Sequence, residues 1–252
     1  MDDPPPLPLE VEAAGPPIDL APSVSRWNLI RDAFVDLVFS VLAGIGASLL
    51  ALIPPFWSIL KHGRPLPLGA LIVGLALGEL SFAYFAFRRL RINRKKGRLV
   101  MSVHEGSIPK AVLWGALAGV ALMGLSAAYT AVAQLLGQSA LTPSIEFVRD
   151  LKGNPMLVAF GVLVIAGVAP VCEELLFRVA MFGSARAAGY SGLGAVVASI
   201  FFAAAHLSLL LAGYYIVFGL VMCWLFTRTR TIVAPMVAHI AVNAAACIAV
   251  LR

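Results

Sequence analysis

The stretch that decides the fold is Met156-Leu-Val-Ala-Phe-Gly-Val-Leu-Val-Ile-Ala-Gly-Val-Ala-Pro-Val171, followed directly by Cys172-Glu-Glu-Leu-Leu-Phe-Arg178. The first part carries no charge and approaches the length of a membrane-spanning helix. The second part puts two carboxylates and a guanidinium at the end of that run. A charged side chain in the middle of a bilayer costs about 3 kcal/mol or more, so such residues indicate a functional site unless they serve only as an ion pair.

The composition of the whole chain agrees with a membrane location. Hydrophobic residues make up 60% and charged residues 13% of the chain, whereas about a quarter of an ordinary soluble domain is charged. Apolar runs near the span length recur at 33–57, 67–87, 111–136, 155–177, 192–211, 213–227 and 231–251. We therefore predict an all-α, polytopic transmembrane bundle of about seven spans, with six to eight as the range. Gly115 and Gly119 predict a small-residue face for close helix packing.

The basic residues predict the orientation in the membrane. Eight of the 19 Lys and Arg residues lie between the second and third spans: Arg88, Arg89, Arg91, Arg94, Lys95, Lys96, Arg98 and Lys110. Short cytoplasmic loops are rich in Lys and Arg, so we expect this loop and the amino terminus in the cytoplasm, in the plasma (inner) membrane. The net charge of +6 is then explained by topology and contact with anionic lipid, and we expect no nucleic-acid partner.

The chain divides into a tail and a membrane domain. Residues 1–25 contain seven prolines and few side chains that could build a core, which predicts a disordered, Pro-rich cytosolic tail. Residues 26–252 form the predicted membrane-embedded helical domain, with a catalytic core at 155–251. Glu79, in the second span, has two interpretations: it lines a polar cavity, or it pairs with Arg88 or a neighbouring helix.

Three polar clusters with helical spacing lie in the last four spans. In Glu173-Glu174-x-x-x-Arg178, Glu174 and Arg178 are four residues apart and can pair, which leaves Glu173 about 100° around the helix. The other two clusters are Phe202-x-x-x-His206 and His239-x-x-x-Asn243. Taken singly, each is compatible with an ion pair, a core histidine or an interhelical hydrogen bond. Together they predict one polar cavity between helices.

These clusters resemble the three motifs of a known family. Val168-Ala-Pro-Val-Cys-Glu-Glu-Leu-Leu-Phe-Arg178, Ala198-Ser-Ile-Phe-Phe-Ala-Ala-Ala-His206 and Val233-Ala-Pro-Met-Val-Ala-His-Ile-Ala-Val-Asn243 are similar, in order and approximate spacing, to those of the CPBP intramembrane proteases. That family includes type II CAAX prenyl endopeptidases and bacteriocin-processing and abortive-infection proteins. The resemblance covers residues 160–245. One departure is Val179, where the family often has Gly.

The resemblance implies hydrolysis of a peptide bond within the membrane. Amide hydrolysis needs an activated water and a stabilised oxyanion. We expect Glu173 and His206 to activate the water, and His239 and Asn243 to donate N–H groups to the oxyanion. We expect Glu174 with Arg178 to orient Glu173.

A zinc mechanism would use the same residues differently. Glu173 or Glu174, His206 and His239 would supply three ligands and leave the fourth position to water. The cofactor is therefore either none or Zn. We favour the metal-free roles, because Asn243 has a function only in the oxyanion scheme.

The expected substrate is a membrane-associated peptide or protein, such as a prenylated carboxy-terminal tail or a leader peptide, which reaches the site from the cytosol or laterally from lipid. The alternative is a non-enzymatic transporter or scaffold that uses the buried Glu and His side chains for proton relay or packing. A transporter of the broken-helix type is built from two related halves with paired interrupted spans, and the sequence shows no such repeat.

Overall fold

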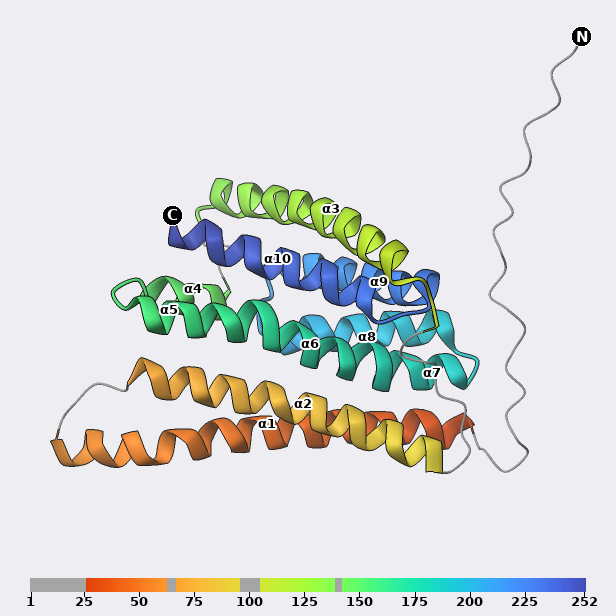
Figure 1. Ribbon diagram of the computed structural model, residues 1–252, viewed down its shortest axis with the longest axis horizontal. Coiled ribbons are helices and arrows are strands. Elements are labelled where there is room, and N and C mark those ends of the chain that lie inside the picture. Colours follow the sequence, from red (N-terminus) through yellow and green to blue (C-terminus); the bar gives the residue numbers. More distant parts are fainter. Residues whose placement is uncertain (1–25, 63–66, 96–104, 139–141) are drawn as a thin grey trace, which may run out of the picture.

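The computed structural model describes residues 26–62, 67–95, 105–138 and 142–252. These residues form helices and contain no strand apart from a single bridge residue, which confirms the predicted all-α bundle. The long helices lie side by side, roughly along the longest axis of the molecule (Figure 1). The predicted tail at 1–25, and Lys96 and Arg98 of the basic loop, fall outside the described residues.

Within the described ranges, seven apolar helices correspond to the seven predicted spans. Six are long and apolar enough to cross a membrane, and the remaining one is apolar but shorter. The long ones are α1 (Arg26–His62), α2 (Leu68–Lys95), α3 (Ile108–Leu135), α9 (Ala212–Thr229), α10 (Val233–Leu251) and a composite helix over Pro155–Ala187; the shorter one is α8 (Ser191–Ala205). A short helix that was not predicted, α4 (Pro143–Asp150), precedes the composite helix. Its eight residues are too few for a clear hydrophobic period.

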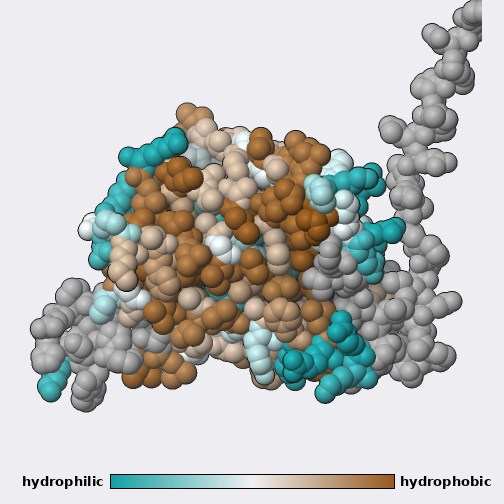
Figure 2. Space-filling model, viewed as in Figure 1, coloured by the Kyte–Doolittle hydropathy of each residue, from teal (hydrophilic) through white to brown (hydrophobic). Residues whose placement is uncertain are grey.

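The outward surface is apolar, as expected of a protein that contacts lipid. On α3, Leu113, Leu117 and Val120 are all more than half exposed. Figure 2 shows hydrophobic residues across the middle of one face, with hydrophilic residues gathered toward its edges. Long apolar helices with exposed apolar side chains between polar ends characterise an integral membrane protein.

Helix α10 is held close to α3 by glycine. A Cβ atom on Gly115 would lie 2.5 Å from the carbonyl oxygen of Ala234, and one on Gly119 would lie 3.4 Å from that of Ala238. The backbones therefore approach at a distance that larger residues do not allow, which confirms the predicted small-residue face. This contact sets the position of α10, which carries His239 and Asn243.

The two ends of the bundle differ in charge. Successive helices alternate in direction (Figure 1), so the end of α2, the start of α3 and the connection between α9 and α10 share one end. Described basic residues at this end are Arg26, Arg31, Arg88, Arg89, Arg91, Arg94, Lys95, Lys110, Arg186, Arg228 and Arg230. The opposite end, with α4 and the carboxy terminus, has Lys61, Arg149, Lys152 and Arg252. We call these the basic end and the opposite end.

Candidate active site

The composite helix contains two wide turns beside the charged motif. It runs through α5 (Pro155–Val162), the π-helix η1 (Leu163–Val168), α6 (Ala169–Glu174), the π-helix η2 (Leu175–Phe182) and α7 (Gly183–Ala187). Short π-helical turns within α-helices often occur at functional sites. Here they flank the segment that carries Glu173 and Glu174.

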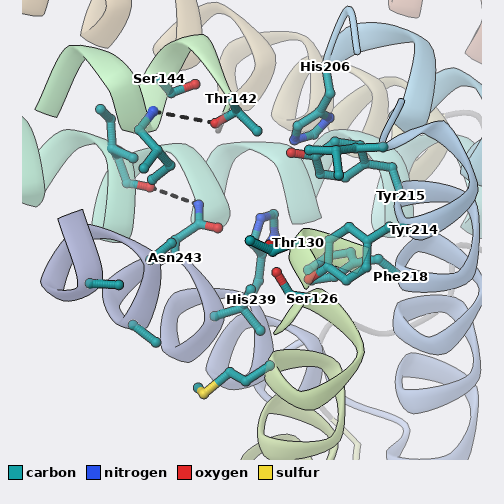
Figure 3. Close-up of a pocket in the computed structure, with 18 of the residues that line it drawn as sticks. Ser126, Thr130, Thr142, Ser144, His206, Tyr214, Tyr215, Phe218, His239 and Asn243 are labelled. Carbon is teal, nitrogen blue, oxygen red and sulfur yellow. Dashed lines mark hydrogen bonds between the residues drawn. The ribbon is translucent and has the colours of Figure 1, made fainter. Parts of the chain in front are cut away.

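A hydrogen bond from Asn243 connects α10 to this helix, at a carbonyl that Pro170 leaves without a backbone donor. In the wide turn the N–H of Ala169 bonds to the carbonyl five residues earlier, that of Val164. By the same spacing the carbonyl of Ile165 would accept from residue 170, but proline has no N–H. The Asn243 Nδ2 amide donates to this oxygen instead, at 2.9 Å (Figure 3).

Glu174 joins two of the predicted site residues. Its Oε2 lies 3.0 Å from Arg178 Nε, so the pair expected from the four-residue spacing is present. Its Oε1 accepts from His239 Nδ1 at 2.8 Å. All three side chains are almost completely buried. We expected Glu174 and Arg178 to orient Glu173. In the structure Glu174 instead hydrogen-bonds to His239, because α10 places the imidazole beside Oε1, the oxygen that does not contact Arg178.

His239 presents its second nitrogen to Glu173. With Nδ1 bonded to Glu174, Nε2 lies 3.8 Å from Glu173 Oε2. This separation is too long for a direct hydrogen bond. The two atoms are nevertheless close enough for one water molecule to hydrogen-bond to both.

His206 lies at the end of α8 and is held by its own helix. The Nδ1–H donates to the Phe202 carbonyl oxygen at 2.8 Å. The ring stacks on that of Tyr215, with centroids 3.8 Å apart and 30° between the planes. Leu207, at φ 50°, then turns the chain out of the helix. Among the described residues, none hydrogen-bonds to Nε2 of His206.

Phe202 packs against several charged or polar groups of the site. Its ring centroid lies 4.6 Å from the Arg178 guanidinium carbon, 4.6 Å from the His206 ring and 5.8 Å from the His239 ring. A guanidinium over an aromatic face is stabilised by cation–π attraction. Phe202 therefore contacts residues of all three motifs. The sequence had singled it out only for its four-residue spacing from His206.

Sequence reasoning missed two aromatic residues of α9. Tyr215 supports His206, and the Phe218 ring lies 4.8 Å from that of His239 at 70°. Their spacing of three residues puts them on one helix face. Two aromatic residues at this spacing are common in apolar helices. The sequence alone does not show that this pair packs against His206 and His239.

The predicted catalytic residues share one cavity of about 480 Å³. Glu173, His206, His239 and Asn243 all line it, as does Glu79 from α2; Figure 3 shows His206, His239 and Asn243 around this space. Glu174 and Arg178 are not among the lining residues. The three motifs therefore converge as the joint interpretation of the clusters predicts.

The cavity extends toward the opposite end of the bundle. Thr142 and Ser144, beside the start of α4, and Leu211, before α9, belong to its lining. We expected access from the cytosol at the basic end or laterally from lipid. The cavity leads away from the basic end, because α8 stops at Ala205 and leaves His206 at the far end of that helix. Lateral access from lipid stays a prediction.

The predicted zinc ligands do not form a metal site in this structure. Within the described ranges, no group of three or more His, Cys, Asp and Glu side chains is arranged to hold one metal ion. Nδ1 of both His206 and His239 is hydrogen-bonded, so Nε2 of each ring is the nitrogen that could bind a metal ion. The choice between the metal-free and the zinc roles stays a prediction, and we derive no step through a metal ion.

Comparison with known proteins gives one match. The model of a family described as type II CAAX prenyl endopeptidase, Rce1-like, matches residues 155–245. This match confirms the family that the three motifs indicate. It covers the composite helix through Asn243 and less than half of the chain. No curated protein and no solved structure matches the chain.

Proposed function

We propose that this protein is an intramembrane endopeptidase that hydrolyses a peptide bond in a membrane-associated peptide or protein. The observation that carries the proposal is the convergence of Glu173, His206, His239 and Asn243, from three separate helices, on one cavity. The Rce1-like match over 155–245 supports the reaction class. Prenylated tails and leader peptides are the substrate types that follow from the family.

Glu173 is the proposed general base. Its carboxylate faces the cavity and is not bound by Arg178, which pairs with Glu174. It accepts a proton from a water molecule, and the resulting hydroxide attacks the substrate carbonyl carbon. His206 Nε2 accepts a hydrogen bond from the same water and orients it. Glu173 then returns the proton to the leaving amine, which completes hydrolysis.

His239 and Asn243 stabilise the oxyanion in this scheme. The buried Glu174 carboxylate, which accepts from Nδ1, stabilises the imidazolium form in which Nε2 also carries a proton. That Nε2–H and the second N–H of the Asn243 amide donate to the developing negative charge. The first amide N–H is committed to Ile165 and orients the group.

Proteolysis by the purified full-length protein in liposomes tests the proposal. The probe is a pool of lipid-anchored peptides of varied sequence, with cleavage read by mass spectrometry. We expect Glu173→Gln to lower the rate by about 10²–10⁴-fold, the usual contribution of a general base. Glu105→Gln, an exposed residue at the basic end, is the matched control. Cleavage that survives in Glu173→Gln and His239→Ala would contradict the assignment.

Two further arms of this experiment address the alternatives. A strong chelator should leave cleavage unchanged if the metal-free scheme holds, whereas loss restored by Zn²⁺ would favour the metal mechanism. The non-enzymatic transporter or scaffold predicts no cleavage of any peptide by the wild-type protein. No contact in the structure favours that alternative.

We further propose that the basic end lies in the cytoplasm, with the amino terminus, and that the protein resides in the plasma (inner) membrane. Eleven described basic residues at that end, against four at the other, support this orientation by the positive-inside rule. The cavity then extends toward the non-cytoplasmic face.

A further inference from the structure

Glu79 on α2 is a second carboxylate in the cavity with no assigned function. It lines the cavity that contains Glu173, and its Oε2 is buried without a hydrogen-bond partner among the described residues. Arg88, the ion-pair partner that the sequence suggested, instead bonds to Asp36 at 2.7 Å. Glu79 is therefore not buried as the ion-pair partner of Arg88.

Two acidic side chains, Glu79 and Glu173, line the cavity, and no Lys or Arg side chain in the described part of the chain lines the same space. The Arg178 guanidinium lies outside the lining, against Glu174 and Phe202. In the proposed mechanism the His239 imidazolium, 3.8 Å from Glu173, balances the charge of that carboxylate. Glu79 Oε2 has no such partner among the described residues, and an unpaired carboxylate in a low-dielectric interior is costly.

The start of α4 reaches the lining but supplies no counter-charge for Glu79. Helix amino termini attract anions. Here, however, the Thr142 hydroxyl accepts from the Ile145 N–H at 3.4 Å, and Glu146 occupies the first turn.

We propose that Glu79 is a specificity residue that binds a cationic group of the substrate, either a Lys or Arg side chain or a free amine, close to the scissile bond. This inference rests on the proposed peptidase function. A positive group beside Glu79 provides the partner that its carboxylate lacks.

The test compares matched peptides with the full-length protein in liposomes. A lipid-anchored peptide that is cleaved in the pool is resynthesised with Lys, Gln or Glu at each position flanking the cut. For the wild-type protein we expect kcat/KM for the best Lys peptide to exceed that of its Glu counterpart at least about tenfold.

Two variants locate the preference. Glu79→Gln should bring the Lys-to-Glu ratio to about one, mainly by slowing the Lys peptide, while the Gln peptide is cleaved nearly as by wild type. Asp150→Asn removes the same charge from an exposed residue at the same end of the bundle, outside the cavity lining. It should leave the ratio unchanged.

The outcomes separate this inference from the function on which it rests. Cleavage without charge preference, or an unchanged ratio in Glu79→Gln, would overturn the role of Glu79 and leave the peptidase intact. Suppose instead that cleavage by the wild-type protein needs a divalent cation and that Glu79→Gln abolishes cleavage. That result would also overturn the proposed role, because Glu79 would then bind a metal ion.

Binding supplies a readout that does not depend on cleavage. Fluorescence anisotropy of the labelled Lys and Glu peptides on wild type and Glu79→Gln measures the same ratio. A Lys preference that depends on Glu79, in a protein that cleaves nothing, would support the cation site and contradict the peptidase. Equal binding of both peptides would overturn the cation site.

Discussion

Pro170 leaves the Ile165 carbonyl without a backbone donor, and Asn243 fills that position. Pro170→Ala would supply an N–H at residue 170 that competes with the Asn243 amide. We expect thermal stability in detergent to be retained or raised, because proline inside a helix costs about 3 kcal/mol relative to alanine. Peptidase activity should fall, since the amide loses its fixed orientation.

Asn243→Ala is the comparison for this prediction. It should lower both activity and stability, the latter by about 1 kcal/mol for one lost hydrogen bond. Unchanged kcat in Pro170→Ala, measured on the same peptide, would show that the tie between Ile165 and Asn243 does not position a reacting group.

The adjacent residues Glu173 and Glu174 should differ in their effect on stability. Glu174→Gln leaves the fully buried Arg178 without its ion pair and weakens the bond to His239. Removing one member of a buried pair costs about 3–5 kcal/mol. Glu173→Gln has no close ion pair to break and should unfold near the wild-type temperature, although it loses activity. Thermal unfolding of both variants by circular dichroism measures this; equal losses would contradict the assigned contacts.

At the scale of elements, the approach of α3 to α10 is the contact most sensitive to a single methyl group. A Cβ on Gly115 would come within 2.5 Å of the backbone at Ala234, so Gly115→Ala must displace α10. Overpacking of this kind costs about 1–3 kcal/mol. Activity should fall as well, because α10 carries His239 and Asn243.

Gly124 offers the matched control on the same helix. Nothing lies within 4 Å of the position of its Cβ, so Gly124→Ala should be neutral or stabilising, by up to about 1 kcal/mol from helix propensity. Chemical denaturation and peptide cleavage measure both effects. A Gly115→Ala variant as stable and active as Gly124→Ala would mean that the two helices adjust freely.

At the scale of the whole molecule, the proposed orientation places Glu105 and Asp150 on different sides of the membrane. Both are exposed, and the three native cysteines are buried. In intact cells a membrane-impermeant maleimide should label Asp150→Cys, whereas Glu105→Cys should react only after permeabilisation. The reverse pattern would put the cavity toward the cytoplasm and contradict the positive-inside assignment.

Much of the fold follows from local properties of the chain. The length of each apolar run predicts a helix, and the four-residue spacing of Glu174 and Arg178 predicts their ion pair, because both depend only on neighbours within one helix. The residues of the three motifs were singled out in the same way. Only α4 was not predicted, because its eight residues are too few to show a clear hydrophobic periodicity.

The tertiary structure decided which helix faces meet. Sequence spacing sets no rotation or depth of one helix against another, so it could not show that Glu174 supports His239, that Asn243 bonds to Ile165 or that Glu79 enters the cavity. Those contacts depend on close packing at residues such as Gly115. For the same reason, the motif residues of the cavity were predictable, but the residues that complete its lining and the end of the bundle toward which it extends were not.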